Sequence, residues 1–288
     1  FPILRGNITP KMKSPRSLLA GFLIALCSFT TELSAQLSFQ FTYQDNNTGF
    51  NDPTTGAARR AALETAALLL STQMPTTTPV TITFTVNSTN EDNDTLASAS
   101  SDTVDGDTGF LSTVAQQKAL TGTDANGSAA DGDINWNFFH NWDLDNDVAP
   151  DASDFISTAM HEILHALGFG GAIDADGNGL LDIPVGQPSV WNTFDQYLID
   201  ANGVRFVDSS FPFNSSLLPK LTGGSSIFFN GPNAMAANGG NPVVIYSPNP
   251  WEDGSSANHT DDATYLGDAA LLMNAATGDG PGVRTLSS

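Results

Sequence analysis

The most constraining stretch of the sequence runs from residue 157 to residue 171 and reads STAMHEILHALGFGG. It contains His161, Glu162 and His165 in an H-E-x-x-H pattern. Residues four apart lie on the same face of an α-helix, so the two imidazoles can reach one metal ion. Glu162 projects about 100° away from His161, which lets it approach a water at that ion without ligating the metal. The pattern therefore predicts a helix that carries a catalytic zinc.

The residues around the motif predict the same helix independently. Asp151 or Ser153 can cap its start, and Gly168 can end it. Both histidines project about 120–170° away from the apolar positions, so we expect one face to pack inward and the other to face a cleft. The apolar positions follow the helical repeat and comprise Ile156, Ala159, Met160, Ile163, Leu164 and Leu167.

Residues 1–35 are predicted to contain a secretory signal peptide. From Met12 the chain carries Lys13 and Arg16, then an apolar run over residues 18–29, and small residues up to Ala35. This order is typical of a leader that starts at Met12 and is cleaved after Ala35. The apolar run is shorter than a transmembrane helix normally requires. The pattern predicts a secreted protein without stable membrane insertion.

The charge and cysteine content exclude several kinds of partner and ligand. Lys and Arg number 10 and Asp and Glu number 31, giving a net charge of −21. Residues 1–35 hold four basic residues and one acidic residue, so the rest carries 6 − 30 = −24. Such a chain repels nucleic acid and anionic membranes, so neither is expected as a partner. The only cysteine, Cys27, lies within the predicted leader, which leaves no thiolate for zinc and no disulfide.

The order of predicted elements indicates an α+β fold. Strands with alternating polarity are expected at 37–43, 80–86 and 134–138, and a helix at 57–72, with weaker signals at 96–100 and 107–115. After residue 171, Asn, Gly, Pro and Ser dominate. There we expect only a short helix at 193–198 and short strands at 226–229 and 242–246. We expect residues 36–288 to form one catalytic domain with lobes at about 36–170 and 171–288.

A catalytic zinc takes three protein ligands, so the motif needs a third. The downstream candidates are His259, Glu252 and the carboxylates from Asp174 onward. Zinc favours imidazole over the carboxylates of a loop that suits calcium. Glu252 would need a helix that Pro250 and a nearby glycine disfavour. The sequence therefore predicts His259 as the third ligand.

These residues also carry a family resemblance. HEILHALGF, the GSS segment before His259, and the later sequence LMN resemble the metzincin clan of zinc peptidases. The pattern is most similar to leishmanolysin-like and related bacterial secreted members, in which the third histidine is displaced. The resemblance implies a two-lobed catalytic domain, with a twisted mixed sheet and an active-site helix above an irregular C-terminal lobe. It also implies zinc ligation by His161, His165 and His259, acid–base catalysis by Glu162, a Met-turn at Met273, and a protein or peptide substrate. Gly171 departs from the compact family pattern, which has a histidine there.

A calcium site is predicted just after the motif. Oxygen-bearing side chains occupy positions 1, 3, 5 and 9 of a loop with glycine at position 6, as in calcium loops, and they are Asp174, Asp176, Asn178 and Asp182. Position 12 is Val185 instead of the usual glutamate, so a plain acidic surface turn stays an alternative.

Two functions are consistent with these patterns. The first is a secreted zinc endopeptidase, expected to act as a monomer on protein or peptide substrates. The second is a calcium-stabilised extracellular binding domain that shares the metzincin-like fold without proteolysis. The presence of Glu162 favours the first, because a binding domain has no use for a general base.

Overall fold

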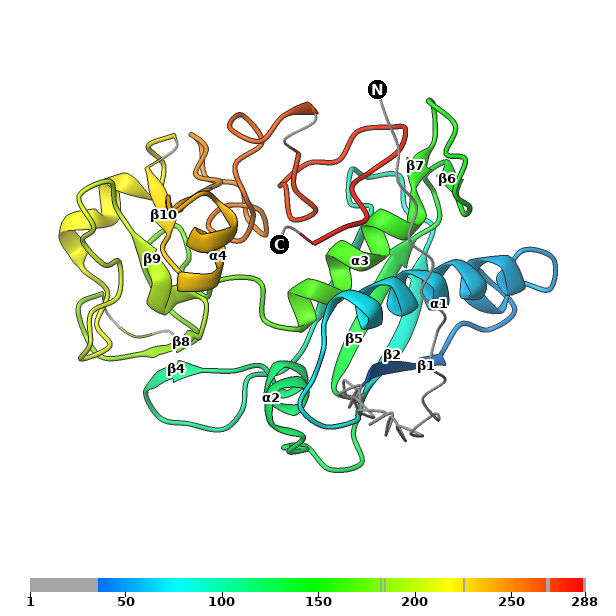
Figure 1. Cartoon of the computed structure of the whole chain (residues 1–288), viewed down its shortest axis with the longest axis horizontal. Coiled ribbons are helices and arrows are strands. Elements are labelled where there is room, and N and C mark those ends of the chain that lie inside the picture. Colours follow the sequence, from blue (N-terminus) through cyan, green and yellow to red (C-terminus); the bar gives the residue numbers. More distant parts are fainter. Residues whose placement is uncertain (1–35, 182, 184, 225, 268–269, 287–288) are drawn as a thin grey trace, which may run out of the picture. The chain divides into compact units, whose positions relative to one another are not determined.

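A four-stranded mixed sheet forms the framework of the computed structural model, which describes residues 36–181, 183, 185–224, 226–267 and 270–286 (Figure 1). The predicted leader, residues 1–35, lies outside these residues. The strand order is β1-β2-β5-β3. The first three strands are parallel and β3 runs antiparallel to β5, at the edge of the sheet. The strands are β1 (Leu37–Tyr43), β2 (Val80–Thr89), β5 (Gly132–Asn137) and β3 (Ala97–Ser100).

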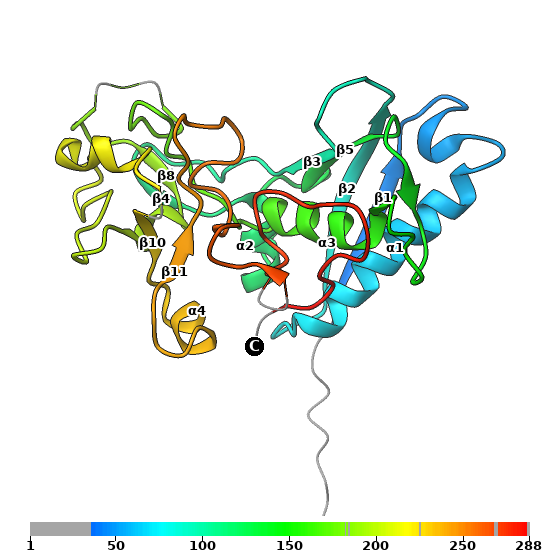
Figure 2. The ribbon, with the colours of Figure 1, turned by 90° about the horizontal axis from the view of Figure 1, so that it is seen from above.

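Two helices, α1 (Gly56–Gln73) and α3 (Phe155–Ala166), cover the same face of this sheet (Figures 1 and 2). Strand β2 alternates buried and more exposed side chains, as its sequence predicts. The first residue of α3, Phe155, packs against Trp136 of β5 with ring centroids 3.9 Å apart, and both side chains are fully buried. Burying one such aromatic side chain stabilises the fold by about 1.5–3 kcal/mol. This contact fixes the start of the motif helix on the sheet.

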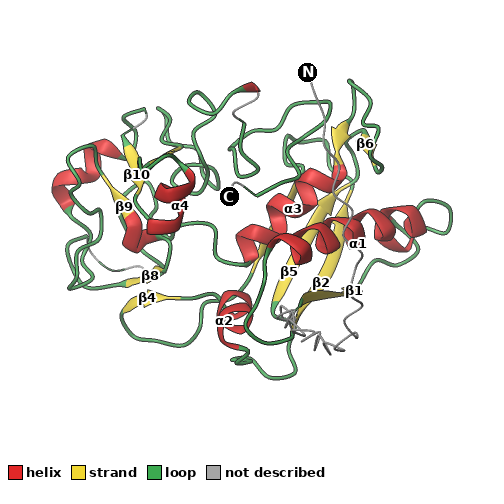
Figure 3. Ribbon diagram, in the orientation of Figure 1, coloured by secondary structure: helices red, strands yellow, loops and turns green. Residues whose placement is uncertain are grey.

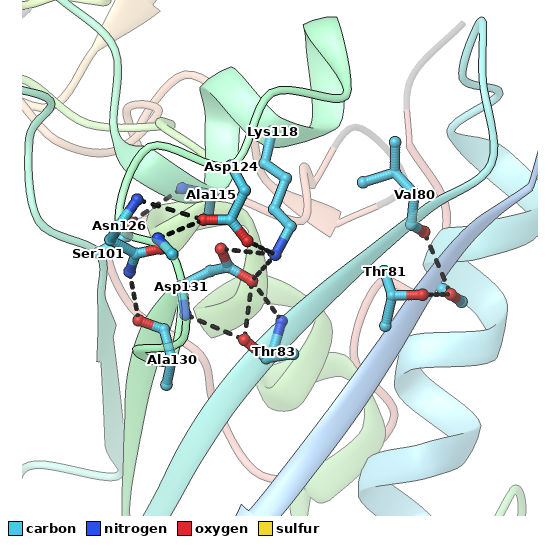
Figure 4. Close-up of polar contacts among 12 residues, drawn as sticks. Val80, Thr81, Thr83, Ser101, Ala115, Lys118, Asp124, Asn126, Ala130 and Asp131 are labelled. Atoms are coloured by element: carbon cyan, nitrogen blue, oxygen red, sulfur yellow. Dashed lines mark hydrogen bonds and ion pairs between the residues drawn. The ribbon is translucent and has the colours of Figure 1, made fainter.

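The loop before β5 holds a buried ion pair (Figure 4). Asp131, the last residue of this loop, is 1% exposed. Its Oδ2 accepts hydrogen bonds from the backbone N–H and the hydroxyl of Thr83, and Lys118 of α2 (Val114–Thr121) lies 2.9 Å away. The ion pair compensates the cost of burying this carboxylate. The pair ties α2 to the sheet.

Loops dominate the chain after α3 (Figure 3). The helix expected at 193–198 is only a 3₁₀ turn, η2 (Asp195–Tyr197), whereas the two expected strands are present as β10 (Ile227–Phe229) and β11 (Val243–Ile245). The other elements are η1 (Gly49–Asn51), β4 (Gly109–Leu111), β6 (Trp142–Asp143), β7 (Ser153–Asp154), β8 (Val190–Asn192), β9 (Leu198–Ile199), η3 (Ser215–Lys220) and α4 (Pro232–Ala237).

The buried apolar side chains form two clusters. The first lies between the sheet and the helices α1 and α3, and it also takes in Met273. The second is built from residues between Ile173 and Ala257. The α+β class predicted from the sequence is confirmed, with a mixed open sheet. Within the described part of the chain, no helix has both the length and the apolar character needed to cross a membrane.

Candidate metal centre

Helix α3 presents its two faces as the sequence predicts. All six residues of the predicted apolar stripe are at most 8% exposed. His161 and His165 lie on the other side, half-buried, and line a cavity of about 1020 Å³. The same cavity is lined by residues 94–101, which include β3, and by residues 274–279 of the C-terminal segment.

Both ends of α3 are held by side chains. Asp154 caps the start, and its Oδ1 accepts from the backbone N–H of Ser157 at 3.0 Å. Arg284 binds both oxygens of the same carboxylate, at 2.8 and 2.9 Å, which anchors the C-terminal segment beside the helix (Figure 2). At the other end, Gly168 has a φ of +95°, a conformation that favours glycine, and Thr113 donates to the carbonyl of Ala166. The helix axis is therefore firmly placed in the fold.

His259 joins the two motif histidines in space. Its Nε2 lies 3.1 Å from Nε2 of His161 and 3.0 Å from Nε2 of His165, and the latter two atoms are 3.0 Å apart. Among the described residues, this is the only group of three or more His, Cys, Asp or Glu side chains close enough to hold one ion. His259 thus meets His165 and His161 at one point, although it follows them by 94 and 98 positions in the sequence.

A backbone carbonyl orients each of the three rings. Nδ1 of His161 contacts the carbonyl of Leu272 at 2.7 Å, and Nδ1 of His165 contacts the carbonyl of Phe169 at 2.7 Å. Nδ1 of His259 contacts the carbonyl of Ser255 at 3.0 Å. Carbonyl oxygens only accept, so each Nδ1 carries a proton and donates it. In a neutral imidazole the other nitrogen then has a free lone pair. All three lone pairs are on the Nε2 atoms that converge.

The pKa values of the histidines favour the neutral form. Burial, and then the nearby His165 and His259, hold the pKa of His161 well below its ordinary value. Burial lowers the pKa of His165 to about 4, with His259 acting in the same direction. Burial also lowers the pKa of His259. Neutral imidazole is the form that binds a metal.

This donor set fits zinc. Tetrahedral zinc with Zn–N bonds of about 2.0–2.1 Å separates its ligand nitrogens by about 3.3 Å, and the three Nε2 atoms lie within 0.3 Å of that spacing. Three unprotonated nitrogens so close together repel one another. A cation shared among them offsets this repulsion, because it attracts all three lone pairs. Carbonyl-bound Nδ1 atoms are also the usual outer-shell partners of metal-ligating histidines. The three-histidine cluster could therefore bind a metal ion such as Zn²⁺.

Glu162 lines the same cavity without joining the cluster. Its side chain is 8% exposed, and burial raises the pKa of its carboxyl to about 7. A backbone hydrogen bond from Ala99 in β3 acts in the opposite direction. A buried carboxyl beside a metal-binding cluster is placed to exchange protons with a molecule in the cavity.

The alternative third ligand, Glu252, does not reach the cluster. Its Oε2 accepts from the hydroxyl of Tyr246 at 3.0 Å, and its side chain is exposed. Met273 lies in a turn and is 5% exposed. The carbonyls of the two turn residues contact the histidine cluster and its loop. Leu272 accepts from His161, and Met273 accepts from the N–H of Thr260, next to His259.

Gly171 occupies the position where the compact family pattern has a histidine, and the structure gives a reason. A Cβ at this position would overlap Oδ1 of Asp195. The backbone N–H of Gly171 donates to the side chain of Asn258, the residue before His259, at 2.7 Å. A larger residue at 171 must therefore displace the Asp195 carboxylate or shift the segment that binds Asn258.

The predicted calcium loop is only partly described, since Asp182 lies outside the described residues. Oδ1 of Asp174 accepts from the backbone N–H groups of Asp176 and Asn178, and its Oδ2 accepts from the Asn178 side chain. These bonds order the loop by themselves, so calcium binding there stays a prediction.

The chain was compared with protein-family models, with curated proteins and with solved structures, and none of the three comparisons gives a match.

Proposed function

We propose that this chain is a secreted zinc-dependent endopeptidase of the metzincin type. One observation carries the proposal: three neutral imidazole nitrogens converge beside a buried carboxyl in a single large cavity. Catalytic zinc sites have three protein ligands and keep one position open, which matches the number of donors here. Met273 lies in a turn next to Leu272, whose carbonyl accepts from His161, and this position supports the family assignment.

The residues of the chain divide the chemistry between them. His161, His165 and His259 would hold zinc, which when bound supplies Lewis acidity toward a carbonyl and toward water. The carboxylate of Glu162 would take a proton from the attacking water while the water oxygen bonds to the scissile carbonyl carbon. It would then deliver that proton to the amine nitrogen as the C–N bond breaks. Protons balance, and Glu162 returns to its starting state.

The edge strand supports a peptide as the substrate. Among the described strands, β3 pairs with β5 alone, and residues 97–100 line the cavity beside α3. An extended peptide can add to such an edge through main-chain hydrogen bonds. A cavity of about 1020 Å³ has room for several residues of such a chain. Secretion is proposed from the leader pattern of residues 1–35, and the strong negative charge argues against nucleic acid as a partner.

Metal analysis combined with a digestion assay tests the proposal. The purified protein should contain about one zinc per chain and cleave casein, because three ligands define one site. Removal of the metal by a chelator should abolish cleavage, and added zinc should restore it. Zinc binding without cleavage of casein or of a mixed peptide library would instead support the calcium-stabilised binding domain. Absence of zinc binding would contradict the metal site itself.

Calcium is proposed as a second, structural ion at the loop that begins at Asp174. Clustered carboxylates repel one another without a cation, so a calcium-selective chelator should lower the melting temperature of the zinc-loaded protein. Asp176→Ala should mimic chelation and abolish the response to added calcium. An identical melting curve with and without calcium would show that the loop is a plain acidic turn.

A further inference from the structure

Asp195 is a fully buried carboxylate without an ion-pair partner among the described residues. The buried carboxylates Asp131 and Asp154 pair with Lys118 and Arg284, whereas no Lys or Arg pairs with Asp195 within the described residues. Burial raises the pKa of Asp195 to about 7, against the hydrogen bonds that it accepts from backbone N–H groups. An unpaired buried carboxyl costs stability, which calls for a compensating role.

The contacts of Asp195 lie on the segment that leaves the motif helix. Its Oδ2 accepts from the backbone N–H groups of Ala172 and Asn192, both at 2.9 Å. Its Oδ1 lies against Gly171, where a Cβ would overlap it. The Asn192 side chain in turn donates to the carbonyl of Gly170 at 3.2 Å. Hydrogen bonds with Asn192 and Asp195 thus hold residues 170–172 in place.

This segment connects two of the three histidines. At one end, the carbonyl of Phe169 accepts from Nδ1 of His165 at 2.7 Å. In its middle, the N–H of Gly171 donates to Oδ1 of Asn258 at 2.7 Å, and His259 follows Asn258 directly. A shift of residues 169–172 would therefore rotate one imidazole and move the loop that carries another.

We propose that Asp195 is a positioning residue of the metal centre: it fixes residues 169–172 and, through them, the ring of His165 and the approach of the His259 loop. The role rests on the metal site of the proposed function, but it does not require peptide hydrolysis. The carbonyl of Phe169 is the outer-shell partner of His165 in this arrangement. Loss of such a partner changes metal affinity by about 10–100-fold, so we expect an effect of this size when Asp195 no longer holds the segment.

Asp200 provides a matched control. It is also buried, at 4% exposure, and its Oδ1 accepts from the backbone N–H groups of Asn202 and Val204. These bonds close a turn at residues 200–204 that does not line the cavity. Asp200→Ala therefore removes a similar set of backbone hydrogen bonds without touching residues 169–172.

The test compares Asp195→Ala, Asp195→Asn and Asp200→Ala in zinc affinity, in the visible spectrum of the cobalt-substituted protein, and in melting temperature. Asp195→Ala should weaken zinc binding by about 10–100-fold and change the cobalt spectrum, which reports ligand geometry. Asp195→Asn should largely restore both, because its amide oxygen can still accept from Ala172 and Asn192. Asp200→Ala should lower only the melting temperature.

Several results would overturn the role. Wild-type zinc affinity and cobalt spectrum in Asp195→Ala would do so, as would an equal loss of affinity in Asp200→Ala. If Asp195→Ala does not fold, Gly171→Ala decides, because its Cβ must displace Asp195 or the segment. An unchanged affinity in that variant refutes the role. A wild-type protein that binds zinc without cleaving peptides would contradict the peptidase assignment alone, while one that binds no metal would remove the metal centre and this role with it.

Discussion

The Glu162→Gln variant is expected to bind zinc as tightly as the unmodified chain while hydrolysing peptides at least ~100-fold more slowly, the scale of a lost general base. Glu162 is not part of the three-histidine cluster, so zinc affinity should not depend on its charge. The amide of glutamine has nearly the same shape but cannot take a proton from water. Zinc content and the rate of cleavage of one peptide, measured on the same preparation, check both halves of this prediction.

Glu252→Gln is the matched control for this variant. Glu252 is the other glutamate downstream of the start of the motif, and its exposed side chain contacts Tyr246 instead of the histidine cluster. It should retain both zinc and activity. Undiminished hydrolysis in Glu162→Gln would remove Glu162 from the mechanism, and the metzincin assignment with it. Loss of zinc in that variant would show that the carboxylate ligates the metal.

The His259→Ala variant should lose zinc and activity together. His161 and His165 alone leave the ion with two protein ligands, one fewer than catalytic zinc sites have. The three Nε2 atoms lie within 3.1 Å of one another, so one donor in three disappears without a substitute nearby. We expect zinc affinity to fall by more than about 100-fold, a larger effect than the loss of an outer-shell partner. Titration against a chelator of known affinity measures this change.

A different histidine serves as the control for His259. His140 is half-buried, its Nε2 contacts the carbonyl of Thr95 at 3.2 Å, and it is not part of the histidine cluster. His140→Ala should keep full zinc affinity and activity. If His259→Ala bound zinc normally, the third ligand would have to be another group, and the displaced-histidine interpretation would be wrong.

Local features of the fold were predictable because they depend on near neighbours. The apolar repeat of α3 and the alternation of β1 and β2 are visible in the sequence, since side-chain direction follows from backbone geometry within a few residues. The short elements after the motif helix were less well predicted. The helix expected at 193–198 shrank to a 3₁₀ turn over Asp195–Tyr197, where tertiary contacts of Asp195 override local propensity.

The candidate ligands were predictable from chemistry, because few residue types bind zinc and the chain has 4 histidines. Their meeting was decided by the tertiary structure. His259 is 98 residues from His161, and nothing in the local sequence determines how a loop of that length returns. The structure brings it back through contacts such as Asn258 with Gly171.

What the sequence alone determined, then, is the motif helix, the two histidines that it presents on one side, and the glutamate between them. The tertiary structure decided which groups orient them: the carbonyls of Leu272, Phe169 and Ser255, and the buried carboxyl of Asp195. The physical reason is that every residue has a backbone carbonyl, so its use as a partner leaves no mark on residue identity. Only the fold selects, from many equivalent carbonyls, the three that hold the histidines in place.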